Sequence, residues 1–260
     1  MKKGIQGAFF LLLATLLCIL QISATTGATS WYTVRNKAHK QPIFDRDLSI
    51  VEEFNGFFID RTHADPTGDK VVYLTFDAGY ENGNVAKILD VLKEKEVSAA
   101  FFVLKHLVTA NGDLIWRMKN EGHTVCNHTA HHPDLSAASS ERIKGELQEL
   151  EACYSALTGA QMAKFFRPPE GKFSTDMLKI VSELGYKTVF WSFAYDDWDN
   201  NRQQSPQKAL QCIMDNMHNG AVILLHPTSQ TNATVLPTVI DELRAQGYRF
   251  GTLEELCGGG

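Results

Sequence analysis

The fold of this protein is decided by the sequence VVYLTFD at residues 71–77, an apolar run of β type that ends in a carboxylate. Residues 84–95 follow it, with apolar side chains at positions 85, 88, 89 and 92 that form one stripe of a helix. Residues 98–103 are again a β-type run. A strand, a helix and a second strand in this order predict two parallel strands joined by a right-handed crossover.

This alternation continues to the end of the chain. The further predicted strands are residues 123–127, 164–166, 188–192, 221–225 and 248–251, and the further predicted helices are residues 113–120, 139–157, 174–184, 206–217 and 235–246. About seven β/α units in roughly 190 residues predict an α/β fold, an incomplete (β/α)7-type barrel. A doubly wound open sheet is the alternative.

The N-terminus has the order of a targeting segment. Two lysines precede the nearly continuous apolar run of residues 8–22, and small residues follow, with Ala24 and Ala28 as candidate cleavage points. This order predicts that residues 1–28 are a secretory signal peptide or an N-terminal membrane anchor, although the run is shorter than the roughly 20 residues of a spanning helix. We therefore expect a secreted protein, or one at the outer face of the cytoplasmic membrane or in the cell wall. Residues 29–67 have weak periodicity and form an irregular lead-in.

The charge balance argues against one class of partner. The chain carries 25 Lys and Arg against 30 Asp and Glu, a formal charge of −5. An acidic chain without a basic patch is not expected to bind nucleic acid. Beyond the apolar run, the four cysteines Cys126, Cys153, Cys212 and Cys257 have no zinc-site spacing and are expected to be free thiols.

Ionisable side chains stand where the predicted strands end. Asp77, His128, Arg167 and His226 each end a strand, and Asp197 follows another by a few residues. The carboxyl ends of parallel barrel strands share one face, where the active sites of such folds lie. The five side chains are therefore expected to meet over one opening.

The spacing of His128 and His132 is that of metal ligands. Pro133 disfavours a helical conformation at His132, so the two imidazoles would lie on a strand end and a loop. Such imidazoles can converge on one divalent ion. The alternative is a surface cluster of polar loop residues.

Five short motifs resemble those of the polysaccharide deacetylase family, in the family's order. They are TFD at residues 75–77, HTAHHP at 128–133, RPPEG at 167–171, DW at 197–198 and LLH at 224–226. The resemblance covers about residues 71–256 and implies an incomplete (β/α) barrel, with residues 68–257 as the deacetylase catalytic domain. TFDAGYENG at 75–83 and FWSFA at 190–194 look most like the branch that deacetylates N-acetylmuramic acid before a δ-lactam forms in spore cortex peptidoglycan.

The resemblance also implies catalytic roles. Asp77 would be the general base, and Arg167 would hold its carboxylate in place. His226 would be the general acid, with Asp197 favouring its protonated form. For Arg167 and Asp197 the alternative is a purely structural ion pair.

Metal and substrate contacts follow from the same motifs. His128 and His132 would bind a divalent cation, zinc first and cobalt or manganese as alternatives. Trp198 would form an apolar wall against a sugar or the acetyl methyl, unless it packs in the core. The turn Pro169-Glu170-Gly171 would contact substrate, with the Glu170 N–H as an oxyanion donor.

The sequence departs from the family pattern at two positions. Most members carry a second Asp after the base as the third metal ligand, and here that position is Ala78, which predicts weaker metal binding. Glu81 is the one nearby carboxylate that would replace it. The branch is expected to have a basic residue at position 170, where Glu170 stands, so Lys172 or another cation would have to compensate.

Three functions follow. The first is N-acetylmuramic acid deacetylation in peptidoglycan, which links the protein to sporulation. The second is the same reaction on N-acetylglucosamine of peptidoglycan or a chitin-like glycan. The third, for which Ala78 is the main argument, is a deacetylase-like domain that binds wall glycan without catalysis.

Overall fold

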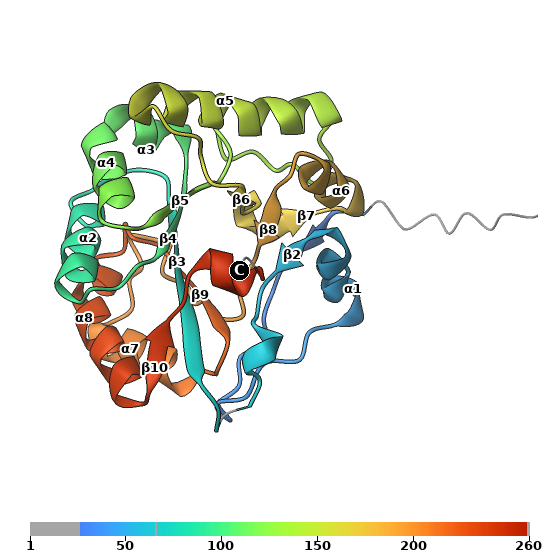
Figure 1. The fold of residues 1–260 in the computed structure, drawn as a ribbon. Helices are drawn as coiled ribbons and strands as arrows, with labels where there is room; N and C mark the ends of the chain where they lie inside the picture. Colours follow the sequence, from blue (N-terminus) through green and yellow to red (C-terminus); the bar gives the residue numbers. More distant parts are fainter. Residues whose placement is uncertain (1–26, 66, 259–260) are drawn as a thin grey trace, which may run out of the picture.

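The computed structural model describes residues 27–65 and 67–258 (Figure 1). Residues 1–26, which hold nearly all of the predicted signal peptide or anchor, lie outside this range. Within the described residues, no helix combines the length and apolarity needed to cross a membrane.

A parallel sheet forms the centre of the molecule. Its longest strand, β3 (Lys70–Ala78), pairs with β4 (Ala100–Val103), β9 (Ala221–Leu225) and β10 (Tyr248–Phe250). From β4 the order continues through β5 (Thr124–Asn127), β6 (Phe165–Phe166) and β8 (Lys187–Val189). Because β9 returns to β3, the sheet curls into a barrel wall, and the predicted α/β barrel is confirmed rather than the open sheet.

The wall closes with help from residues 29–67. Strand β2 (Gly56–Phe57) pairs in parallel with β8, and Ile59 then bridges Ala221 of β9. Two residues further along β9, Ile223 forms a parallel bridge with Phe193. The segment with weak periodicity therefore contributes a strand to the ring. The last strand, β10, instead lies beside the first residues of β3.

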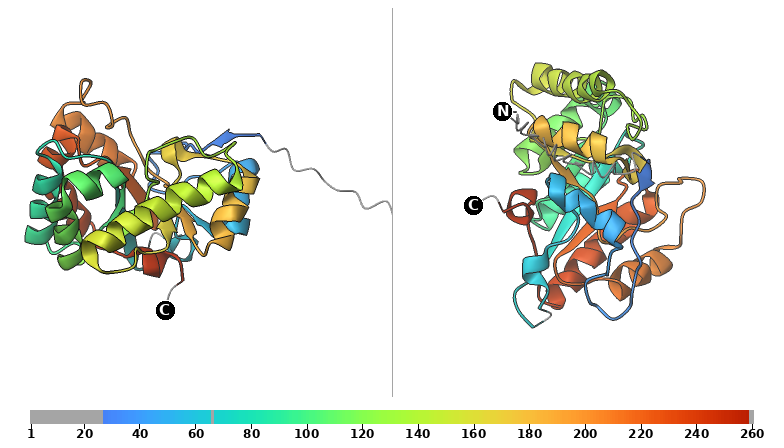
Figure 2. Two further views of the ribbon diagram at one scale, coloured as in Figure 1. Left: turned by 90° about the horizontal axis from the view of Figure 1, so that it is seen from above. Right: turned by 90° about the vertical axis from the view of Figure 1, so that its right-hand side faces the viewer.

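Helices cover the outside of the wall (Figures 1 and 2). The long ones are α2 (Val85–Glu94), α4 (Gly112–Asn120), α5 (Ser140–Thr158), α6 (Thr175–Glu183), α7 (Pro206–Asp215) and α8 (Gln230–Ala245). The shorter elements are β1 (Thr29–Ser30), α1 (Arg46–Ser49), η1 (Ile50–Phe54), η2 (Arg61–His63), α3 (Lys105–Ala110), η3 (Pro169–Gly171), β7 (Lys172–Phe173) and α9 (Leu253–Leu256).

One helix begins earlier than its apolar stripe predicts. Helix α8 starts at Gln230 rather than Val235, because the Ser229 side chain accepts the N–H of Asn232 and caps the first turn.

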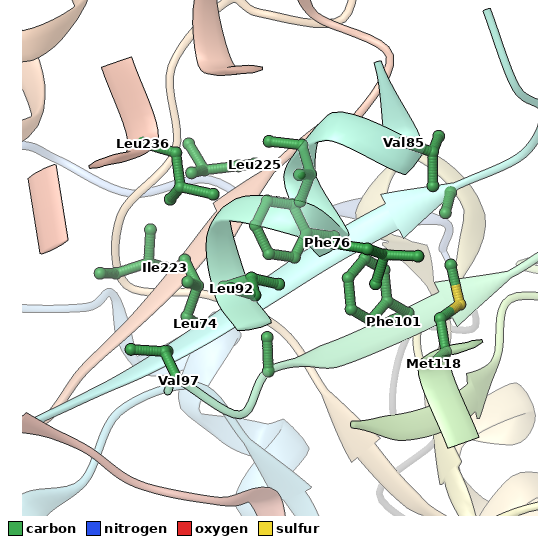
Figure 3. Close-up of a cluster of buried hydrophobic side chains, with 14 of the residues drawn as sticks. Leu74, Phe76, Val85, Leu92, Val97, Phe101, Met118, Ile223, Leu225 and Leu236 are labelled. Atoms are coloured by element: carbon green, nitrogen blue, oxygen red, sulfur yellow. The ribbon is translucent and has the colours of Figure 1, made fainter. Parts of the chain in front are cut away.

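Side chains of β3 alternate between the helix layer and the barrel interior. Leu74 and Phe76 point outward into the core against the helices, where Phe76 stacks on Phe101 with ring centroids 5.0 Å apart (Figure 3). Thr75 and Asp77 consequently point inward. Ala78 belongs to the outer, helix-facing cluster.

Candidate active site

A cavity of about 780 Å³ opens at the carboxyl ends of the strands. Its walls include most of the side chains that the sequence marked. They are Asp77, His128, His132, Glu170, Gly171, Trp198 and His226. Arg167 and Asp197 lie buried directly behind this lining and hold Asp77 and His226.

Asp77 is fixed by a fully buried arginine. Arg167 donates from Nη1 to Asp77 Oδ1 at 2.8 Å and from Nη2 to Thr75 Oγ1 at 2.9 Å. Its Nε and Nη2 also donate to the carbonyls of Val189 and Phe190, at 2.9 and 3.1 Å. Burial by itself would raise the pKa of Asp77, but the charge of Arg167, with smaller help from the two nearby histidines, lowers it. Asp77 is thus a carboxylate, able to accept a proton.

His128 lies beside this carboxylate. Its Nδ1 is 2.8 Å from the Arg167 carbonyl oxygen, and its Nε2 is 3.6 Å from Asp77 Oδ2. A carbonyl acceptor at Nδ1 fixes the proton there, which leaves Nε2 with a free lone pair. Burial lowers the pKa of His128 to about 4, so the ring is neutral at neutral pH.

His132 completes the pair of imidazoles. The two rings lie 5.0 Å apart between centroids, at 75° to each other. His132 has a φ of 59°, in the left-handed region, and its N–H donates to Thr129 Oγ1 at 2.8 Å. Such a backbone requires support from the surrounding loop, and this one turns His132 back toward His128.

Three residues near the site residues in the sequence, among them the candidate ligand Glu81, point elsewhere. His131 contacts the buried Glu146, with Nδ1 3.2 Å from Oε1. Glu81 accepts the N–H groups of Gly83 and Ala86 and so caps α2. Ala78 faces the helix layer.

The donor set therefore fits a divalent ion on two imidazoles. Across residues 27–65 and 67–258, no group of three or more His, Cys, Asp or Glu side chains is placed to hold a metal. Two imidazoles that converge beside a carboxylate still provide suitable nitrogen ligands, with water left to fill the remaining positions.

His226 directly follows strand β9, the neighbour of β3, and has its own carboxylate. Asp197 is buried, and its Oδ1 lies 2.7 Å from His226 Nδ1 while its Oδ2 accepts the His226 N–H at 2.8 Å. Burial by itself would lower the pKa of His226, but the charge and hydrogen bond of Asp197 outweigh it and raise the pKa. His226 therefore stays protonated to a higher pH than a free imidazole and has Nε2 left for substrate.

Asn232 is a site residue that sequence reasoning missed. Its Nδ2 donates to Asp197 Oδ2 at 2.6 Å and to the His226 carbonyl at 3.0 Å, and Tyr195 donates to its Oδ1. The signal available was Ser229, whose capping position places Asn232 in the first turn of α8.

Trp198 is 58% exposed and lines the cavity, which excludes the core-packing alternative. Tyr80, 44% exposed, lines it too, and Asn200 donates to the Tyr80 hydroxyl at 2.6 Å. Both aromatic faces are available to a ligand such as a sugar ring.

The turn after Arg167 forms a further wall. Pro169 is buried, whereas Glu170 and Gly171 line the cavity with φ values of 56° and 66°. Lys172 Nζ lies 2.8 Å from Glu170 Oε2 and 3.5 Å from Asp134 Oδ2. The cation that the sequence required near Glu170 is present, and two carboxylates share it.

Barrel and site together define a class of hydrolase. The family model described as polysaccharide deacetylase matches residues 64–189. The chain belongs to this family, whose members are in general metalloenzymes.

Individual relatives make the placement finer. The chain is 40% identical over 228 residues to the peptidoglycan-N-acetylmuramic acid deacetylase PdaA of Bacillus subtilis. The matched residues make up 87% of this chain and 85% of the relative. The structure of PdaA, a family 4 carbohydrate esterase, superposes with a TM-score of 0.84 at 39% identity, over 89% of this chain and 97% of that chain.

Two relatives of lower identity are described as a deacetylase of another sugar and as a pseudoenzyme, respectively. A peptidoglycan-N-acetylglucosamine deacetylase of Bacillus cereus is 32% identical over 197 residues, covering 74% of this chain and 90% of the relative. A structure described as a family 4 pseudoenzyme from Bacillus anthracis has a TM-score of 0.69 at 29% identity, over 78% of this chain and 69% of that chain.

Proposed function

We propose that this protein is a peptidoglycan N-deacetylase that acts on N-acetylmuramic acid residues. One observation carries the proposal: a fixed carboxylate, Asp77, and a carboxylate-paired imidazole, His226, line the same cavity. The identity to PdaA supports muramic acid as the sugar. The freed amine would then attack the lactyl carboxyl carbon, with loss of water, to give the muramic δ-lactam of spore cortex.

The reaction is the hydrolysis of an amide. Asp77 takes a proton from the attacking water, whose oxygen bonds to the acetyl carbon. Arg167 keeps Asp77 oriented and ionised between attacks. His226 gives its proton to the nitrogen as the C–N bond breaks, which yields acetate and a free amine. Asp197 keeps His226 protonated for this step.

Other groups bind and polarise the acetamide. The Glu170 N–H would donate to the oxygen that becomes negative. A divalent ion on His128 and His132, zinc in the first place and cobalt or manganese as alternatives, would polarise the same carbonyl and lower the pKa of water. Trp198 would contact the sugar face or the acetyl methyl.

A substrate in the cell wall requires an exported enzyme. The basic, apolar and small-residue order of residues 1–28 supports export, either by a cleaved signal or with the segment kept as a membrane anchor.

N-acetylglucosamine is the second candidate sugar, favoured by the charge of the cavity. Within the described residues, the lining holds the carboxylates of Asp77, Glu170 and Asp196 but no Lys or Arg, and Lys172 is already shared by two carboxylates. A lactyl carboxylate would meet this acidic rim, whereas N-acetylglucosamine carries no such group. Glycan binding without catalysis is the third candidate, supported by Ala78 and by the Bacillus anthracis pseudoenzyme.

One assay separates the three candidates. Pure protein is incubated with amidase-treated peptidoglycan and with zinc, cobalt, manganese or chelator, and the products are measured as acetate and by mass spectrometry. Muramic δ-lactam supports the first function, and free glucosamine without lactam supports the second. Glycan binding without acetate release under any metal supports the third. An Asp77→Asn variant is the matched control for contaminating activity.

A further inference from the structure

The segment that precedes the barrel lies against a wall of the candidate active site. Strand β1 pairs antiparallel with β7, in the register Thr29 with Phe173 and Ser30 with Lys172. The Trp31 N–H then donates to the Gly171 carbonyl at 2.9 Å. Residues 29–31 thus extend along the turn that carries Glu170 and Gly171.

The Trp31 side chain reaches a second wall. Its Nε1 donates to the Trp191 carbonyl at 2.9 Å, and Trp191 lines the cavity. The indole is 4% exposed and stacks on Phe190 with centroids 4.5 Å apart. Phe44 lies on the same indole at 5.3 Å. One buried side chain therefore links two chain segments that form the cavity.

These contacts leave no slack at the turn. A Cβ on Gly171 would lie 2.7 Å from the Trp191 ring, which is too close for two carbon atoms, and 3.0 Å from the Trp31 Cβ, which is an unusually tight contact. The same strand end also supports the base, because the Phe190 carbonyl accepts from Arg167, which holds Asp77. A shift of Trp31 would therefore displace both the Glu170-Gly171 turn and Trp191.

We propose that Trp31 is a positioning residue for the active site: it fixes the Glu170-Gly171 turn and Trp191 at a set distance from Asp77. Trp31 lies outside residues 68–257, the predicted catalytic domain. The kinetic part of this inference depends on the proposed function, whereas the structural part does not.

The test compares Trp31→Phe and Trp31→Ala with Phe44→Leu. Trp31→Phe keeps an aromatic ring and loses the Nε1–H, and Phe44→Leu disturbs the same aromatic cluster at a ring that does not line the cavity. Hydrogen exchange of the Gly171 and Lys172 amides is measured in the full chain, with kcat, KM and the pH profile expressed per folded molecule.

We expect the Gly171 and Lys172 amides to exchange faster in both Trp31 variants. We also expect kcat to fall about fivefold in Trp31→Phe and about thirtyfold in Trp31→Ala, which is less than the roughly hundredfold loss that a full displacement of about 1 Å can cause. The pH limits should move little, because the titrating groups are unchanged. KM should also move little, because the Glu170 N–H donates to the oxygen that becomes negative during the reaction. Phe44→Leu should lower stability and leave kcat per folded molecule near the wild-type value.

Two results overturn the inference. One is unchanged amide exchange and unchanged kcat per folded molecule in Trp31→Ala. The other is an equal loss of kcat in Phe44→Leu, which would mean that the cluster acts through general stability. If the wild-type protein releases no acetate, the proposed function fails, and amide exchange alone decides the role of Trp31.

Discussion

The two sides of the cavity are built in different ways. On the base side, Arg167 holds Asp77 while its other N–H groups donate to Thr75 and to the backbone carbonyls of Val189 and Phe190. On the acid side, Asp197 holds His226, and Asp197 itself accepts from the backbone N–H of His226 and from the side chain of Asn232. Arg167 is held by backbone carbonyls at the end of β8, whereas Asp197 lies in a loop and depends in part on a side chain from the first turn of α8.

This difference teaches which parts of the site tolerate change. The backbone of a strand stays in register when one side chain is altered. The orientation of Asp77 therefore depends mainly on the ion pair between Asp77 and Arg167. The acid side is a chain of buried polar side chains, in which each member needs its neighbour to satisfy its hydrogen bonds. Mutations next to the catalytic groups should therefore matter more on the acid side.

The largest effect is expected at the base itself. Asp77→Asn keeps an acceptor for Arg167 but removes the group that takes the proton, so kcat should fall by about a thousandfold or more, with KM little changed. Acetate release measures the rate, and circular dichroism verifies the fold. A loss below about tenfold would assign the base elsewhere.

Asp197→Asn is expected to have the next largest effect, with a pH signature. Asp197 raises the pKa of His226, so its neutralisation lowers that pKa and reduces the protonated fraction at neutral pH. We expect kcat to fall about a hundredfold and the alkaline limb of its pH profile to move to lower pH. The acidic limb, which we assign to Asp77, should stay in place. An unmoved alkaline limb would exclude His226 as the acid.

Asn232→Leu tests the dependence on neighbouring side chains. The variant withdraws the donor to buried Asp197, and we expect kcat to fall about tenfold, as is typical when the partner of an active-site group is lost. Thr234→Ala, on an exposed position of the same helix, is the control and should keep the wild-type rate. Equal activity in Asn232→Leu and Thr234→Ala would mean that the acid side does not depend on the side chain of Asn232.

The last prediction, for Ala78→Asp, concerns stability and zinc affinity rather than the reaction rate. An Asp at this position must turn away from the apolar helix layer to reach an ion, so without metal we expect a loss of about 1–3 kcal/mol in unfolding free energy. With zinc, calorimetry should show affinity raised by about tenfold over the two-imidazole site, in the range that a single supporting group contributes. Tight zinc binding by the wild type, without gain in Ala78→Asp, would mean that water or another group already completes the site.

The sequence by itself determined the order of strands and helices and the end of the strands at which the site lies. Successive strand side chains point to opposite faces, so the strand alone requires Asp77 and Ala78 to face opposite sides of the sheet. The order of strands and helices then sufficed to bring the strand ends carrying Arg167 and His226 to one face.

The tertiary structure alone decided how the site is finished. Strand β2 closes the ring, and Trp31 and Asn232 support the walls, through contacts between residues far apart in the chain. Periodicity records which face of its own element a residue occupies, but not which distant partner packs against it, and these features depend on that partner.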